Sequence, residues 1–162
     1  MSTRQNKGFS LIELVIVVVI IGIIGAIAIP RLSRGAEGAA DSKLVGDLAV
    51  LRSAIDLYSA EHGGTYPSET EATFIAQLTQ YTDMDGKPSA TQGGDFIYGP
   101  YLRKIPKLSV GTNKGEDGIL GAASGTLGAA GSGWYYDGTN GEIIANLANG
   151  EKDKANIDYN DY

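Results

Sequence analysis

The sequence predicts an α+β protein in which one long N-terminal helix, membrane-spanning in its first half, packs with its second half on a small antiparallel sheet. Three observations predict this fold. Residues 9–29 form an apolar run whose only charged residue is Glu13. Residues 44–58 carry apolar side chains at helical spacing, and residues 63–162 combine many glycines with short aromatic and β-branched runs.

The apolar run is long enough to cross a membrane. As a helix its 21 residues would measure about 31 Å, close to the thickness of the hydrocarbon core of a bilayer. A carboxylate at the centre of such a helix costs roughly 2.5 to 3.5 kcal/mol on insertion scales, so Glu13 requires a cationic partner. We therefore assign residues 9–30 to a transmembrane and assembly helix.

Two simpler interpretations of this run stay open at this point. Arg4 and Lys7 with an Ala26-Ile27-Ala28 cleavage pattern resemble a secretory signal peptide, although the run is long for one and contains Glu13. Alternatively, the run is a plain signal anchor in which Glu13 lies at the interface. The positive-inside rule does not orient the helix, because basic residues lie on both sides of it.

Beyond the run, residues 31–62 are amphipathic. The spacing of four, three, four and three between the apolar residues predicts a helix with one buried stripe, formed by Leu44, Leu48, Leu51, Ile55 and Tyr58. Pro30 lacks a backbone N–H, so a kink or a loosened turn is expected there. His62-Gly63-Gly64 predicts the C-terminal end of the helix.

Residues 63–162 predict a single small head domain, with 17 glycines among 100 residues. The capping-box spacing of Ser68 and Glu71 predicts a short helix over about 69–81. Runs at 133–136 and 142–145 predict a hairpin closed by residues 137–141. Eight glycines in 111–133 predict a mobile loop with some chance of short strands, and the acidic tail 147–162 is expected to be loosely held.

The N-terminus resembles a known family. A short basic leader ending in Gly8, then Phe9-Ser10-Leu11-Ile12-Glu13-Leu14 and a long apolar helix, is similar to the processing signal of type IV pilins and type II secretion pseudopilins. The resemblance implies a pilin-like fold and a leader, residues 1–8, that prepilin peptidase removes between Gly8 and Phe9. It also implies N-methylation of Phe9 and local melting of the helix near Pro30.

The physical chemistry of the run fits that processing. Cleavage before Phe9 would create an ammonium group close to Glu13, and two charges that are costly in an apolar core can neutralise each other. The pairing can form within one helix or between neighbours, where it would specify one register. The hypothesis is that Glu13 of an incoming subunit engages the amino group of Phe9 in the filament.

Parts of the head resemble the G-type major pseudopilin, notably Gly64-Thr65-Tyr66-Pro67 and the stretch from Gly99 to Lys107. The Asp-Pro-Trp-Gly stretch typical of that type is replaced here by residues 108–111. G-type proteins hold calcium with acids of the C-terminal half. The calcium candidates are therefore Glu116, Asp117, Asp153, Asp158 and Asp161. Acids beside glycines are also common in solvated turns, and no ligand spacing is diagnostic.

Composition excludes several other classes of function. The chain has one histidine, His62, and no cysteine, which removes thiol nucleophiles, disulfides and most zinc sites. Many type IVa pilins have a C-terminal disulfide loop, so the lack of cysteine favours a pseudopilin. Removing Arg4 and Lys7 with the leader lowers the basic residues from 13 to 11 against 19 acidic ones, a charge of −8. No basic stripe for nucleic acid is visible, and no enzyme is expected.

The sequence therefore predicts a structural subunit of a type II secretion pseudopilus, anchored by a single pass in the inner membrane with its head in the periplasm. Its expected partners are membrane lipid before assembly, prepilin peptidase, the inner-membrane assembly platform with its ATPase, minor pseudopilins and other copies in a homopolymer. The alternatives are a type IV pilin for adhesion, motility or DNA uptake, and a monomeric membrane-anchored binding module. No cofactor other than calcium is expected.

Overall fold

The computed structural model describes residues 9–153 and 155–162, without the side chains of Pro30, Ser33 and Arg34. The first element is the helix α1, Leu11–Glu61. It confirms the long helix that was expected between Phe9 and Glu61. The chain divides into two compact units, one ending at Gly38 and the other formed by Ala39–Tyr162.

In the first unit, α1 is largely apolar from Leu11 to Ile29, and the side chains of this part are open to solvent. One helical segment of the described residues, Leu11–Ile29, is long and apolar enough to cross a membrane, and no part of it is buried within the structure. The helical assignment continues through position 30. The side chain of Pro30 lies outside the described residues, so the expected kink stays a prediction.

The second unit is built on the remainder of α1. The predicted apolar stripe is confirmed: its five side chains, Leu44, Leu48, Leu51, Ile55 and Tyr58, are each at most 1% exposed. The helix ends where expected, because Gly63 and Gly64 adopt positive φ angles of 67° and 89°. The N–H of Gly64 donates to the carbonyl of Ser59 at 2.8 Å, which satisfies one of the last helical carbonyls.

The short helix α2, Glu71–Thr79, confirms the prediction for 69–81 with tighter bounds. The predicted capping box is wrong. Thr70 is the N-cap residue and makes no side-chain cap, while Ser68 Oγ accepts from Thr70 N at 3.2 Å. The carboxylate of Glu71 accepts instead from Ile119 N at 3.2 Å, a partner distant in sequence. Two short strands, β1 (Tyr81–Thr82) and β2 (Pro88–Ser89), follow α2 as an antiparallel pair.

The head contains a three-stranded sheet of order β3-β4-β5, formed by Ile119–Gly121, Trp134–Asp137 and Glu142–Ala145. The predicted hairpin is confirmed as β4 and β5, which pair antiparallel. The sheet is mixed, however, because β3 runs parallel to β4 with Ile119 opposite Trp134. This third strand arises inside the glycine-rich segment 111–133.

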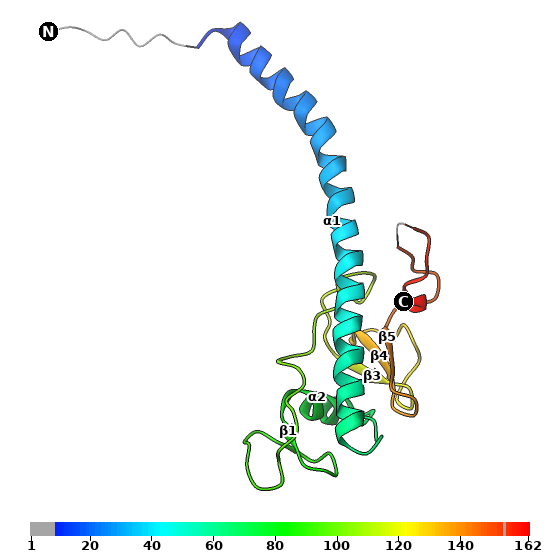
Figure 1. Cartoon of the computed structure of the whole chain (residues 1–162). Coiled ribbons are helices and arrows are strands. Elements are labelled where there is room, and N and C mark those ends of the chain that lie inside the picture. The colour runs from blue at the N-terminus through cyan, green and yellow to red at the C-terminus, as the bar shows by residue number, and fades with distance from the viewer. Residues whose placement is uncertain (1–8, 154) are drawn as a thin grey trace, which may run out of the picture. The chain divides into compact units, whose positions relative to one another are not determined.

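Figure 1 shows the sheet beside α1 in the second unit, and one core cluster contains side chains of both. Alternate residues of β4 point inward, so Trp134 and Tyr136 are fully buried while Tyr135 is half-buried. Trp134 Nε1 donates to the carbonyl of Pro106 at 2.8 Å. Tyr136 packs on Phe74 of α2 with ring centroids 4.6 Å apart. The α+β fold expected from the sequence is therefore observed.

Candidate assembly site

The candidate site begins at the first turn of α1. Ser10 precedes the helix, and its carbonyl accepts from Leu14 N at 3.2 Å. Glu13 lies in the first turn, and its Oε2 accepts a hydrogen bond from the backbone N–H of Ser10 at 2.9 Å. This is one half of a capping box, in which an acidic third residue reaches back to the residue before the helix. The Ser10-x-x-Glu13 spacing could have predicted it.

Phe9 lies directly before this turn and is 84% exposed. Gly8, the other residue of the expected cleavage site, lies outside the described residues. Glu13 therefore turns its carboxylate toward the start of the helix, where the amino group of Phe9 would lie after cleavage. The arrangement suits an electrostatic contact at the first turn, since a negative side chain is favourable at a helix N-terminus.

Beyond Glu13 the helix presents large apolar side chains on all of its faces. Every leucine, isoleucine and valine from Leu14 to Ile29 is between 46% and 71% exposed. A helix that is apolar all round is stable only inside lipid or protein. Its exposed surface is far larger than the apolar patches that soluble monomers usually show. The site is thus a surface that other molecules must cover.

Two of the calcium candidates lie in the loop before β3. The side chains of Glu116 and Asp117 point into solvent, and one oxygen of Asp117 lies 3.7 Å from Lys107 Nζ. A nearby lysine opposes cation binding. Among the residues that the structure describes, no group of three or more acidic, histidine or cysteine side chains gathers to hold a metal ion.

The other three candidates lie in the tail, and two of them already accept hydrogen bonds from it. Asp153 accepts from Ile157 N at 2.8 Å and from the hydroxyl of Tyr162 at 2.5 Å. Asp158 accepts from Gly150 N at 2.9 Å. The third candidate, Asp161, belongs to the 3-10 helix η1, Tyr159–Asp161. The five residues therefore do not fit a calcium site, because they do not converge and protein donors occupy key oxygens.

The tail, residues 147–162, was expected to be loosely held, but the structure shows it in contact with the core and with α1. Leu147 is fully buried in the core. The hydroxyl of Tyr159 donates to Asp41 on α1 at 2.7 Å, and Arg52 donates to the carbonyls of Ile143 at 3.2 Å and of Tyr162. These contacts join residues more than 90 positions apart, so no local pattern could predict them. They fasten the tail to α1.

The contacts of the tail shift the pKa values of three of its side chains. The hydrogen bond from Tyr162 lowers the pKa of the Asp153 carboxyl. The same hydrogen bond raises the pKa of the Tyr162 hydroxyl to about 12. Burial, together with the hydrogen bond to Asp41, raises the pKa of Tyr159 as well. Both tyrosines therefore stay neutral donors throughout the physiological pH range.

Comparison with known proteins found one matching family and several similar proteins. The family described as the prokaryotic N-terminal methylation motif matches residues 3–29. The type II secretion system core protein G of Vibrio cholerae serotype O1 is 30% identical over 104 residues, 64% of this chain and 65% of that protein. The chain thus spans just under two thirds of this relative.

Two further relatives bear the same name, type II secretion system core protein G. The protein of Aeromonas hydrophila is 31% identical over 107 residues, 66% of this chain and 69% of that protein. The protein of Pectobacterium carotovorum subsp. carotovorum is 31% identical over 121 residues, 72% of each chain. No solved structure matches the chain.

Proposed function

Because the chain belongs to the family of type II secretion system core protein G, the major pseudopilins, we propose that it is the structural subunit of a pseudopilus. The observation that carries the proposal is the exposed apolar helix Leu11–Ile29 with one carboxylate at its start. A monomeric anchor would also use the apolar run, but it has no use for a charge placed beside a cleavage site.

Before assembly, lipid covers the apolar helix, and the chain is anchored in the inner membrane with its leader in the cytoplasm and its head in the periplasm. Prepilin peptidase cuts between Gly8 and Phe9 and methylates the new N-terminus. The methylation motif matched at residues 3–29 supports this step. An inner-membrane platform with its ATPase then extracts the subunit, and minor pseudopilins join the same filament.

In the filament, helices of neighbouring copies replace lipid around α1. Burying roughly a dozen large apolar side chains per subunit contributes about 1.5 to 3 kcal/mol each relative to water. Such burial is not directional, so it does not set the register between copies. The pairing of Glu13 with the amino group of Phe9 on a neighbour supplies the register, since a buried ion pair tolerates few arrangements.

The proposal is tested with Glu13→Ala and Glu13→Leu in the native host. Both variants should insert into the membrane and be cleaved, yet form no filament and leave exported proteins in the periplasm. Glu116→Ala is the matched control, because it removes an exposed acid whose side chain makes no hydrogen bond within the described part of the chain. Normal filaments and normal secretion with both Glu13 variants would refute the proposal.

A further inference from the structure

Arg31 lies just beyond the apolar span of α1, in the first unit. The span ends at Ile29, and the helical assignment continues through Arg31. The two positions between them advance the helix by about 3 Å along its axis. Each headgroup layer of a bilayer is about 5 to 8 Å thick, since the hydrocarbon core of about 30 Å widens to about 40 to 45 Å when both layers are included. When the span crosses a membrane, Arg31 therefore lies in the layer that contains the lipid phosphates.

The side chains next to Arg31 are apolar. A hollow of about 480 Å³, here called the Arg31 hollow, is lined by Ala28, Ile29, Arg31 and Leu32. Ile29 and Leu32 are 71% and 77% exposed. A phospholipid has the same two components, because its acyl chains are apolar and its phosphate lies just outside them. The hollow therefore fits a lipid better than a soluble anion, which would leave the apolar lining in water.

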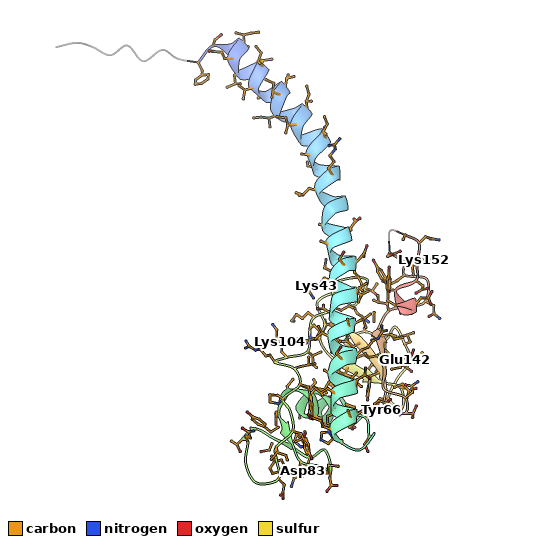
Figure 2. All side chains as sticks on the ribbon, viewed as in Figure 1. Lys43, Tyr66, Asp83, Lys104, Glu142 and Lys152 are labelled. Atoms are coloured by element: carbon orange, nitrogen blue, oxygen red, sulfur yellow. The ribbon has the colours of Figure 1, made fainter. Side chains whose placement is uncertain are left out.

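No acid close to the hollow matches the charge of Arg31. Residues 14–29 are uncharged, and Figure 2 shows their side chains projecting from the ribbon as carbon alone. Arg31 is exposed and makes no hydrogen bond or ion pair in the part of the chain that the structure describes. Beyond it, Arg34 and Glu37 contribute opposite charges. Arg31 therefore gives this end of the span its net positive charge.

The other end of the span has no comparable net charge in the processed chain. Cleavage before Phe9 removes Arg4 and Lys7 from that end. It leaves the new ammonium group of Phe9 and the carboxylate of Glu13, whose charges offset each other. The basic charge that can hold the processed helix against a membrane surface thus lies at the end of the span that leads into the head.

We propose that Arg31 binds the phosphate of an anionic phospholipid in the leaflet on the head side of the membrane, with the acyl chains of that lipid over the apolar lining of the Arg31 hollow. This inference rests on the proposed function, which places the helix in the membrane before assembly. A guanidinium binds phosphate through two parallel N–H donors. Zwitterionic headgroups also bring an ammonium, for which the hollow has no acidic partner, so lipids of net negative charge are preferred. The contact holds the subunit at one depth and breaks when the helix is extracted.

The test measures which lipid stays with the chain. The protein is purified from its native host into vesicles of equal phosphatidylglycerol and phosphatidylcholine, and native mass spectrometry after solubilisation gives the ratio of the two bound lipids. We expect an excess of phosphatidylglycerol, which Arg31→Gln should lower roughly fivefold, the contribution of one basic residue near an anionic membrane. Arg103→Gln is the matched control. It removes the same side chain from an exposed position of the head that has no printed-distance partner among the described residues, and it should leave the ratio unchanged.

Two further measurements separate the lipid contact from its alternatives. Arg31→Lys keeps the charge and should keep most of the excess of phosphatidylglycerol. Soluble glycerol phosphate has the anion without the acyl chains and should not displace the lipid. An unchanged ratio in Arg31→Gln would overturn the proposal, and so would displacement by millimolar glycerol phosphate. Loss of filaments in Arg31→Gln at an unchanged ratio would assign Arg31 to a contact between copies instead.

The same preparations distinguish a failure of this inference from a failure of the proposed function. The mass of the chain shows whether residues 1–8 have been removed, and electron microscopy shows whether the unsubstituted chain forms filaments. A retained leader or missing filaments would contradict the proposed function, while the lipid ratio would still report on Arg31. An unchanged ratio in a processed chain that forms filaments would overturn the lipid contact alone.

Discussion

Glu13 accepts a hydrogen bond from the backbone N–H of Ser10 at 2.9 Å, across the first turn of α1. The carboxylate thus has two possible roles. It can form an ion pair with the amino group of Phe9, or it can serve only as a cap for its own helix. The two roles differ in whether they require the negative charge, since glutamine also serves in a capping box.

The substitution Glu13→Gln separates these roles. The carboxamide oxygen still accepts from Ser10 N, but the side chain no longer carries the charge that the Phe9 ammonium requires. We expect Glu13→Gln to insert and to be cleaved normally, and to form about as few filaments as Glu13→Leu, by electron microscopy of sheared material. Assembly of Glu13→Gln at the normal level would assign Glu13 to helix capping instead.

A second prediction concerns the fastening of the tail. Tyr159→Phe removes the hydroxyl that donates to Asp41 at 2.7 Å while keeping the ring. We expect a loss of about 1.5 to 3 kcal/mol in the free energy of unfolding, as for other hydrogen bonds to charged groups. A thermal melt should show a midpoint lower by several degrees.

The control for this substitution is Tyr135→Phe. The hydroxyl of Tyr135, on β4, makes no hydrogen bond within the described residues, so its removal should leave the midpoint unchanged. Equal midpoints for both variants and the unsubstituted chain would mean that the hydrogen bond from Tyr159 to Asp41 adds nothing to stability.

The contact between Asp153 and Tyr162 predicts a pH dependence. The pKa of Asp153 is lowered in the fold, so its contribution is present above the ordinary carboxyl pKa of about 4 and is lost as the pH falls below it. The pKa of Tyr162 is raised to about 12. Its contribution is therefore complete below the ordinary tyrosine pKa of about 10 and is lost as the pH rises toward 12.

Melts between pH 3 and 12 should thus show a plateau from about pH 5 to 9 and a fall on each side. In Tyr162→Phe both falls should become smaller and the plateau lower. Identical profiles for Tyr162→Phe and the unsubstituted chain would show that this hydrogen bond contributes nothing to stability in solution.

Calcium provides a fourth prediction. The five candidate acids do not gather, and Asp153 and Asp158 already accept hydrogen bonds from the chain. A ligand at about 100 times its Kd would stabilise the fold by about 2.7 kcal/mol. We expect no such gain, so the melting midpoint should be equal in millimolar calcium and in chelator. A rise of several degrees in calcium would contradict this account of the tail.

Features that depend on residues close together in sequence could be predicted, and features that depend on distant partners could not. The long helix, its buried stripe from Leu44 to Tyr58 and the hairpin of β4 and β5 all follow from periodicity and turn residues within one segment. The two residues of the proposed assembly site, Phe9 and Glu13, are also close in sequence: Glu13 lies in the first turn of α1, and Phe9 precedes the helix.

The features that were missed depend on partners distant in sequence. The parallel strand β3 forms because it can pair with β4 across the glycine-rich segment. Glu71 does not cap its helix, because the unpaired N–H of Ile119 in that strand takes its carboxylate. The tail is held by Asp41 and Arg52, which lie on a helix at the other end of the chain.

The intact mass of the chain, purified from its native host, tests the central claim most directly. The account predicts a chain that begins at Phe9 and carries one N-terminal methyl group, because only that cleavage creates the ammonium that Glu13 requires. A mass that still includes residues 1–8 would leave no such group beside Glu13 and would contradict the account. A mass that corresponds to a chain beginning at Ile29 would contradict it too, since the apolar helix would then have been removed.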